Sequence, residues 1–187
     1  MKRPIPDVLT AEEQAQLLDA MPSGSLLQQR NIVMLRLMLN AGLRSQEVCN
    51  LRVSDLSLPS GKLLIRGKGG RQRIVWLSDD DLNLLKSYLE AWRPSGTMFQ
   101  TGSGQPILTR YLRSMMAQAQ ARAGLDKPSP PHLLRHTFAT DLLRETKNLR
   151  LVQKALGHAR ISTTEIYTHI VDDELEDAMK MLRGGTP

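Results

Sequence analysis

PHLLRHTFATDLL, residues 131–143, is the stretch that most narrows the choice of fold. Its first proline stands where a helix begins, and the pattern predicts a helix from about Pro131 to about Glu145. On that helix His132 and Arg135 are three residues apart, so an imidazole and a guanidinium share one face. An arginine can hold a phosphate through two hydrogen bonds, and a histidine beside it can move a proton. Taken alone, the same spacing also describes an ordinary surface pair.

A second informative stretch, LGHARISTTEIYTH, covers residues 156–169. Gly157 is placed to end a helix predicted over residues 149–156. A serine followed three residues later by a glutamate forms a capping box, which predicts another helix over residues 163–170. Tyr167 falls in its second turn. By itself it is as well explained by a core or a surface tyrosine.

The rest of the chain is predicted to be mainly helical. Two β-rich runs, residues 62–65 and 73–77, flank a glycine-rich turn and predict one hairpin. The expected fold class is therefore mainly α with a small antiparallel β-sheet (α+β). Further helices are predicted at residues 10–21, 26–40, from 45, 78–92, 110–123 and about 172–182.

Composition and charge narrow the function. The 187 residues are 41% hydrophobic and 24% charged, which is typical of a globular domain. The 25 lysines and arginines outnumber the 19 acidic residues, giving a net charge of +6. Basic residues without any acid occupy residues 62–73 and 91–125, whereas residues 172–177 hold five acids. This distribution favours a polyanionic partner such as nucleic acid.

The same survey argues against membrane insertion and secretion. The most apolar run, residues 31–43, is shorter than a span and carries an arginine. The N-terminus lacks the apolar stretch of a signal peptide. A single cysteine, Cys49, fits a reducing compartment, so we expect a cytoplasmic protein with no membrane partner.

Two further positions carry charge in suggestive places. In AGLRSQEVCNL, residues 41–51, Arg44 lies at a helix junction and Glu47 follows three residues later. Lys68 lies in the glycine-rich turn of the predicted hairpin. A surface ion pair and a solvated turn lysine would explain these residues equally well.

Together, residues 41–51, 131–143 and 156–169 resemble the tyrosine recombinase (phage integrase) family, and the likeness runs from about Thr10 to Ile170. It implies the catalytic-domain fold that this family shares with type IB topoisomerases. Members cut duplex DNA by attack of a tyrosine hydroxyl on a phosphodiester, leaving a 3′-phosphotyrosyl enzyme and a free 5′-hydroxyl. A second 5′-hydroxyl then attacks that linkage. Bond energy is conserved, so the resemblance implies no cofactor, ATP or metal.

The resemblance assigns the phosphate-binding groups. Arg44 and Arg135 match the two arginines that hold the phosphate, and His158 matches a third donor to it. The pentacoordinate transition state concentrates negative charge on the non-bridging oxygens, which a guanidinium fork stabilises better than an ammonium.

It also assigns the groups that move protons. Tyr167 matches the nucleophile; an unperturbed tyrosine is ionised to roughly one part in a thousand at pH 7, so it needs a proton acceptor. His132 matches the general acid/base, and Lys68 matches the residue that protonates the leaving 5′-oxygen. Glu47, which orients the first arginine, and His136, which packs, are supporting residues. The full expected catalytic set is Arg44, Lys68, His132, Arg135, His158 and Tyr167.

Other basic residues are expected to contact the DNA backbone and to give salt-dependent, largely sequence-independent affinity. These are Arg71, Arg73, Arg110 and Arg113. A metal site is not expected, because the residues between His132 and His136 lack the glutamate of a His-Glu-x-x-His motif.

Most members of the family carry an N-terminal DNA-clamping domain, whereas here about ten residues precede the first predicted helix. We therefore expect residues 1–187 to form a single catalytic domain without the N-terminal core-binding domain, as a fragment or a natural short form. Residues 171–187 would form a C-terminal tail helix, docking on its own core or on a neighbour. The expected partner is double-stranded DNA, bound by a homotetramer on paired sites. The sequence leaves open whether the protein is a monomer when free in solution.

Two other functions remain open from the sequence. A type IB topoisomerase-like enzyme would use the same transesterification to relax supercoils. A non-catalytic DNA-binding regulator would read DNA through a helix-turn-helix at residues 44–56.

Overall fold

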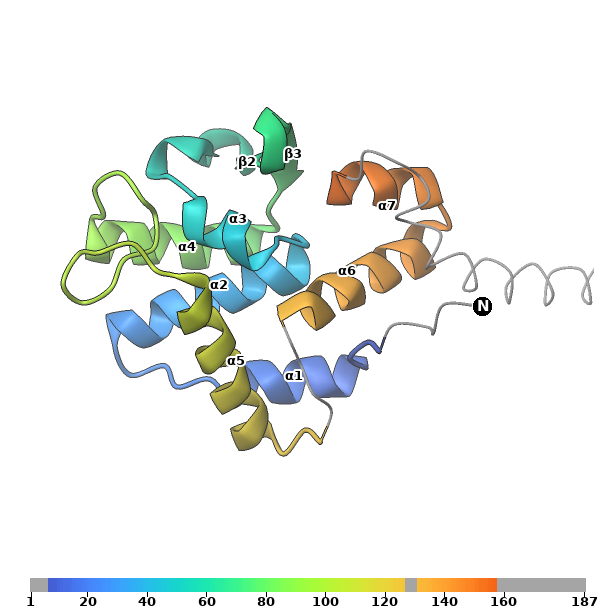
Figure 1. Ribbon diagram of the computed structural model, residues 1–187, viewed down its shortest axis with the longest axis horizontal. Helices are drawn as coiled ribbons and strands as arrows, with labels where there is room; N and C mark the ends of the chain where they lie inside the picture. Colours follow the sequence, from blue (N-terminus) through green and yellow to red (C-terminus); the bar gives the residue numbers. More distant parts are fainter. Residues whose placement is uncertain (1–6, 127–130, 158–187) are drawn as a thin grey trace, which may run out of the picture.

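The computed structural model describes residues 7–126 and 131–157 (Figure 1). Within these ranges the chain forms seven α-helices and one three-stranded antiparallel sheet, which confirms the expected fold class. The helices are α1 (Ala11–Asp19), α2 (Leu26–Asn40), α3 (Ser45–Asn50), α4 (Asp79–Trp92), α5 (Thr109–Ala123), α6 (Pro131–Thr146) and α7 (Leu149–Leu156). The strands are β1 (Leu56–Ser57), β2 (Lys62–Arg66) and β3 (Gln72–Trp76).

Several helices begin where the sequence supplies a capping side chain. Thr10 accepts a hydrogen bond from the backbone N–H of Glu13, whose carboxylate accepts one from the backbone of Thr10 in return. Ser78 accepts from Asp81 at the start of α4, and Asn148 caps α7 in the same way. Each cap satisfies a backbone donor that the helix itself leaves unpaired.

Helix α2 lies at the centre of the molecule, and about half of its residues are buried (Figure 1). It packs against α4 and against α6. Its two arginines have polar partners: Arg30 donates to the carbonyl of Gln100, and Arg36 pairs with Asp81. The helix also contacts α3, so it touches two of the elements, α3 and α6, that carry functional residues described below.

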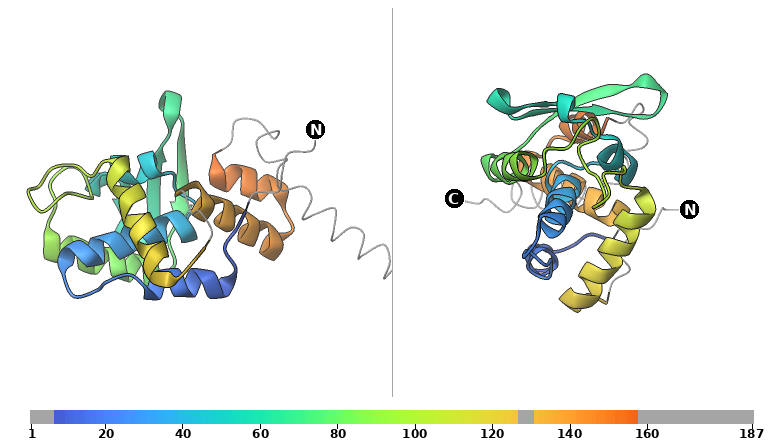
Figure 2. Two further views of the ribbon diagram at one scale, coloured as in Figure 1. Left: turned by 60° about the horizontal axis from the view of Figure 1, so that its bottom comes forward. Right: turned by 90° about the vertical axis from the view of Figure 1, so that its left-hand side faces the viewer.

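The sheet lies over one side of the helical body, and the turn between β2 and β3 projects beyond it (Figure 2). Leu63 pairs with Val75 and Ile65 with Arg73, so the apolar residues of the inner face are buried in the core. Strand β1 was not predicted, because two residues are too few to show an alternating pattern.

Helices α6 and α7 pack against each other through a small apolar cluster of their own. Ala139 and Leu143 of α6 contact Val152 and Leu156 of α7. This contact fixes α7 against α6, and α7 also contacts β3. In the described ranges, no helix combines the length and the apolar character needed to cross a membrane.

Gly42 allows a close approach between the end of α2 and α6. Its φ is +64°, and a Cβ there would lie 2.4 Å from the ring of Phe138. Any side chain at this position would therefore meet both backbone strain and a clash.

We expect Gly42→Ala to lower the free energy of unfolding by about 2–4 kcal/mol, because strain and overpacking add. Gly69→Ala is the matched control, since Gly69 also has a positive φ but a Cβ added there would meet nothing within 4 Å. It should cost only about 1 kcal/mol. Urea denaturation measures both values, and equal losses would contradict the steric argument.

Candidate functional site

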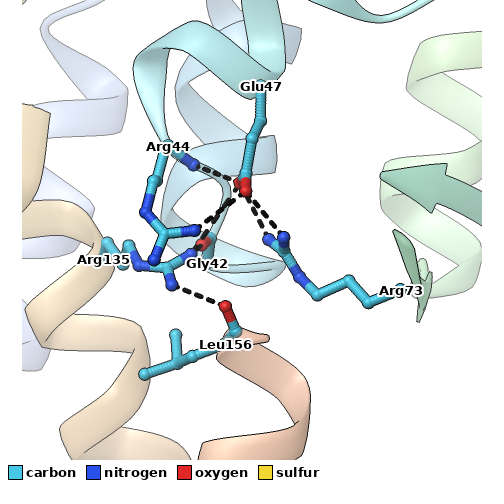
Figure 3. A network of polar contacts seen from close by, with 6 residues as sticks. All are labelled: Gly42, Arg44, Glu47, Arg73, Arg135 and Leu156. Atoms are coloured by element: carbon cyan, nitrogen blue, oxygen red, sulfur yellow. Dashed lines mark hydrogen bonds and ion pairs between the residues drawn. The ribbon is translucent and has the colours of Figure 1, made fainter. Parts of the chain in front are cut away.

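A buried carboxylate, Glu47, lies at the centre of a network of three arginines (Figure 3). Arg44 and Glu47 come from α3 and its N-cap, Arg73 from β3 and Arg135 from α6. All three guanidinium groups lie within 4 Å of the Glu47 carboxylate. Segments far apart in the sequence thus meet at one charged point.

Arg44 is held by local structure. It is the N-cap residue of α3, and its backbone N–H donates to Oε2 of Glu47 at 2.8 Å. Its Nη1 donates to Oε1 of the same carboxylate at 3.0 Å. The side chain is nevertheless 39% exposed, so an anion can reach this guanidinium from solvent.

Arg73 donates hydrogen bonds to the same carboxylate from both of its terminal nitrogens. Nη1 donates to Oε1 at 2.7 Å and Nη2 donates to Oε2 at 2.8 Å. The two short, parallel bonds form the bidentate geometry in which arginine binds a carboxylate most strongly. Because the Arg73 side chain is only 10% exposed, this pair is largely shielded from water.

Arg135 is buried and is positioned by the ends of two helices. Its Nη2 donates to the carbonyl of Leu156 at 2.7 Å, and its Nη1 donates to the carbonyl of Gly42. The Leu156 carbonyl belongs to the last turn of α7, where no intrahelical donor is available. Nη1 also lies 3.8 Å from Oε2 of Glu47. The guanidinium is therefore fixed before any ligand arrives.

The arginines keep Glu47 ionised. Burial alone would raise the pKa of this carboxyl. The hydrogen bonds and charge of Arg73, the backbone N–H of Arg44 and the charge of Arg135 outweigh burial and lower the pKa to about 2. Three positive charges and one negative charge leave the network with a net charge of about +2.

The two histidines of α6 differ in exposure. His132 is exposed on the first turn of the helix, one turn before the buried Arg135. His136 is half-buried, and its pKa is lowered by burial and by the positive charges of His132 and Arg135. The lowered pKa favours the neutral imidazole, which suits the packing role expected for His136.

Part of the expected catalytic set lies outside the described residues. This applies to His158, to Tyr167 and to the whole of the predicted helices after residue 157. Lys68 belongs to the short 3₁₀ turn Lys68–Gly70 between β2 and β3, as predicted, but its side chain is not described. The expected roles of these three residues stay predictions.

The residues expected to contact the DNA backbone lie in different environments. Arg71 is exposed beside the hairpin turn, and Arg110 and Arg113 are exposed on α5. Arg73 instead turns inward to Glu47, so its side chain is not offered to solvent. No local pattern could have indicated this, because the partner carboxylate is 26 residues away.

An open cavity of about 650 Å³ lies between α3, the sheet and the start of α5. Arginines from three segments line it: Arg52, Arg66 and Arg110. Arg66 also pairs with the buried Asp55. Sequence analysis missed Arg52 and Arg66 as candidates, although Arg66 lies within the acid-free basic run.

The two other tyrosines of the chain are accounted for by packing. Tyr88 is fully buried, and its hydroxyl donates to the carbonyl of Met98, so it is a core residue. Burial raises its pKa to about 12. The Tyr111 hydroxyl bonds to Asn31 and to Arg30, whose guanidinium also lies over the ring.

Comparison with known proteins identifies the family. Residues 7–174 match the family model described as "Phage integrase family". The chain belongs to this family. The predicted resemblance is therefore confirmed, and this family membership is consistent with the convergence of Arg44 and Arg135.

The similar curated proteins are tyrosine recombinases. The chain is 36% identical to tyrosine recombinase XerC of Halalkalibacterium halodurans, over 94% of this chain and 62% of that protein. It is 39% identical to a tyrosine recombinase of Pseudothermotoga lettingae, over 99% of this chain and 64% of that protein. The chain thus spans about three fifths of the length of these relatives.

Solved structures agree with this assignment. The site-specific recombinase XerH, bound to palindromic difH substrate in a post-cleavage complex, matches with a TM-score of 0.83 and 31% identity. That match covers 96% of this chain and 54% of XerH. The recombinase XerA matches with a TM-score of 0.81 and 30% identity, over 98% of this chain and 68% of XerA. The fold is that of tyrosine recombinase catalytic domains.

The lowered pKa of Glu47 predicts a pH dependence of stability. Its ionised form stabilises the fold fully above the unfolded-state pKa of about 4.5, and this contribution is lost as the pH falls toward 2. The loss should reach about 3 kcal/mol. Glu47→Gln should be less stable than wild type at pH 7, and the difference should shrink below pH 4.5. Denaturation curves of both proteins between pH 2 and 7 measure this difference in the free energy of unfolding. A difference that stays constant over this pH range would contradict the prediction.

Proposed function

We propose that this chain is the catalytic domain of a site-specific DNA recombinase, which cuts and rejoins duplex DNA through a 3′-phosphotyrosyl intermediate. The observation that carries the proposal is the convergence of Arg44 and Arg135 on Glu47. Two guanidinium groups fixed at one point, one of them open to solvent, match the needs of a phosphodiester whose charge grows in the transition state.

In the proposed reaction, the Tyr167 oxygen attacks the phosphorus and the bond from phosphorus to the 5′-oxygen breaks. The phenolic proton passes to a base, and the leaving oxygen takes a proton from Lys68. His132 is the candidate for the acid/base role, because it lies exposed one turn before Arg135. A 5′-hydroxyl from a second strand then reverses these steps, so that neither ATP nor a metal takes part.

Double-stranded DNA is the proposed partner, bound as a homotetramer on paired sites. XerH, which is 31% identical, has been solved with a DNA substrate. The phosphate backbone could be contacted by the arginine-lined cavity at the start of α5. The exposed side chains of Arg71, Arg110 and Arg113 offer further contacts. The names of the relatives favour recombination over a topoisomerase-like or purely regulatory function.

We expect Tyr167→Phe to abolish covalent attachment to DNA while leaving DNA binding unchanged, because only the nucleophilic oxygen is removed. The substrate is a pool of nicked duplexes with randomised flanks. These trap the adduct, because the short fragment that carries the free 5′-hydroxyl dissociates after cleavage. Denaturing gels measure the adduct, and filter binding measures affinity.

Tyr111→Phe is the matched control, because it removes the hydroxyl of a different, partly exposed tyrosine and should retain the adduct. An adduct formed by Tyr167→Phe, or none formed by wild type with any duplex, would refute the proposed function. Supercoil relaxation without paired sites would favour the topoisomerase-like alternative.

A further inference from the structure

Arg73 has a contact pattern that differs from that of the other basic residues on the hairpin. Both of its terminal nitrogens bond to Glu47. Within residues 7–126 and 131–157, its Nε is buried and has no hydrogen-bond partner. In this part of the chain, its polar interactions are therefore directed to a single carboxylate.

Packing holds Arg73 in this place. A Cβ at Gly157 would lie 3.0 Å from Cδ of Arg73, so the end of α7 is closely packed on the arginine stem. Gly67, at the start of the hairpin turn, also lies near the same carboxylate, since a Cβ there would stand 4.0 Å from Oε1 of Glu47. The arginine is thus enclosed between the hairpin, α3 and α7.

We propose that Arg73 is a positioning residue for the arginine pair Arg44 and Arg135, and that it acts through Glu47. The inference rests on the proposed function, because it concerns the phosphate that these two arginines would hold. Arg73 itself would not touch the DNA at the cleavage point.

The physical argument is one of charge and geometry. Glu47 is close enough to Arg44 and Arg135 to compete with a phosphate for both. The Arg73 fork occupies both carboxylate oxygens and offsets the negative charge of Glu47. Without Arg73, Arg44 and Arg135 would be drawn further onto Glu47, and the positive potential available to the phosphate would fall.

The test compares three variants in single-turnover cleavage of nicked duplexes at saturating DNA. Arg73→Gln removes the charge, and Arg73→Lys keeps the charge but loses the fork. Arg36→Gln is the matched control, because it also takes an arginine from a buried carboxylate, Asp81, outside this network. Cleavage is measured per folded molecule, for a normal phosphate and for a methylphosphonate, in which an uncharged methyl group replaces one non-bridging oxygen.

On the normal phosphate, Arg73→Gln is expected to cleave roughly 30-fold more slowly than wild type, and Arg73→Lys roughly 10-fold more slowly. On the methylphosphonate, the defect of Arg73→Gln should shrink at least about 5-fold, because less charge remains to be stabilised. Arg36→Gln should lower stability without changing either rate.

Two outcomes would overturn the inference. Equal defects on the two substrates would indicate a merely structural role for Arg73. A defect that is present at subsaturating DNA but absent at saturating DNA would make Arg73 an ordinary DNA contact.

If wild type forms no adduct at all, the proposed function fails, and the positioning role is then decided by anion binding. At fixed ionic strength, inorganic phosphate is expected to raise the thermal unfolding midpoint of wild type and of Arg36→Gln. The rise for Arg73→Gln should be at least about 3-fold smaller. Equal shifts in the three proteins, including no shift at all, would overturn the inference.

Discussion

The burial of one ionised carboxylate constrains the whole site. A buried carboxylate is strongly unfavourable unless it is paired and hydrogen-bonded. Glu47 meets this requirement only if α3, β3 and α6 come together, because its three arginine partners lie on or beside these elements. Removing one partner of such a buried pair typically costs about 3–5 kcal/mol. The fold and the site therefore depend on the same contacts.

Backbone groups complete this arrangement at the ends of two helices. Gly42 and Gly157 both have positive φ, near the C-terminal ends of α2 and α7. Arg135 donates directly to the carbonyl of Gly42 and to that of Leu156, the residue before Gly157. The carbonyl end of a helix carries partial negative charge, which favours a nearby cation. The same backbone groups that end α2 and α7 thus also orient the guanidinium of Arg135.

Local signals made much of this predictable from sequence. The capping residues Thr10 and Ser78 and the apolar periodicity of α2 lie within a few residues of what they determine. The pairing of Arg44 with Glu47 is likewise local, at a spacing of three residues. The inward turn of Arg73 and the contact of Arg135 with Gly42 join residues 26 and 93 positions apart. Only the folded chain brings these groups together. From the sequence, Arg73 was visible only as part of a basic run, and it was therefore predicted to contact DNA.

The charge balance of the site links stability to function. A fold selected for stability alone would match Glu47 with one arginine, because surplus buried positive charge is costly. Here three guanidinium groups surround one carboxylate, and one of them, on Arg44, is partly exposed. A surplus of about two positive charges would destabilise the free protein, and a bound anion would offset this cost. A phosphodiester whose charge grows on non-bridging oxygens gains most from this surplus, since the arginines are already held in place before the reaction begins.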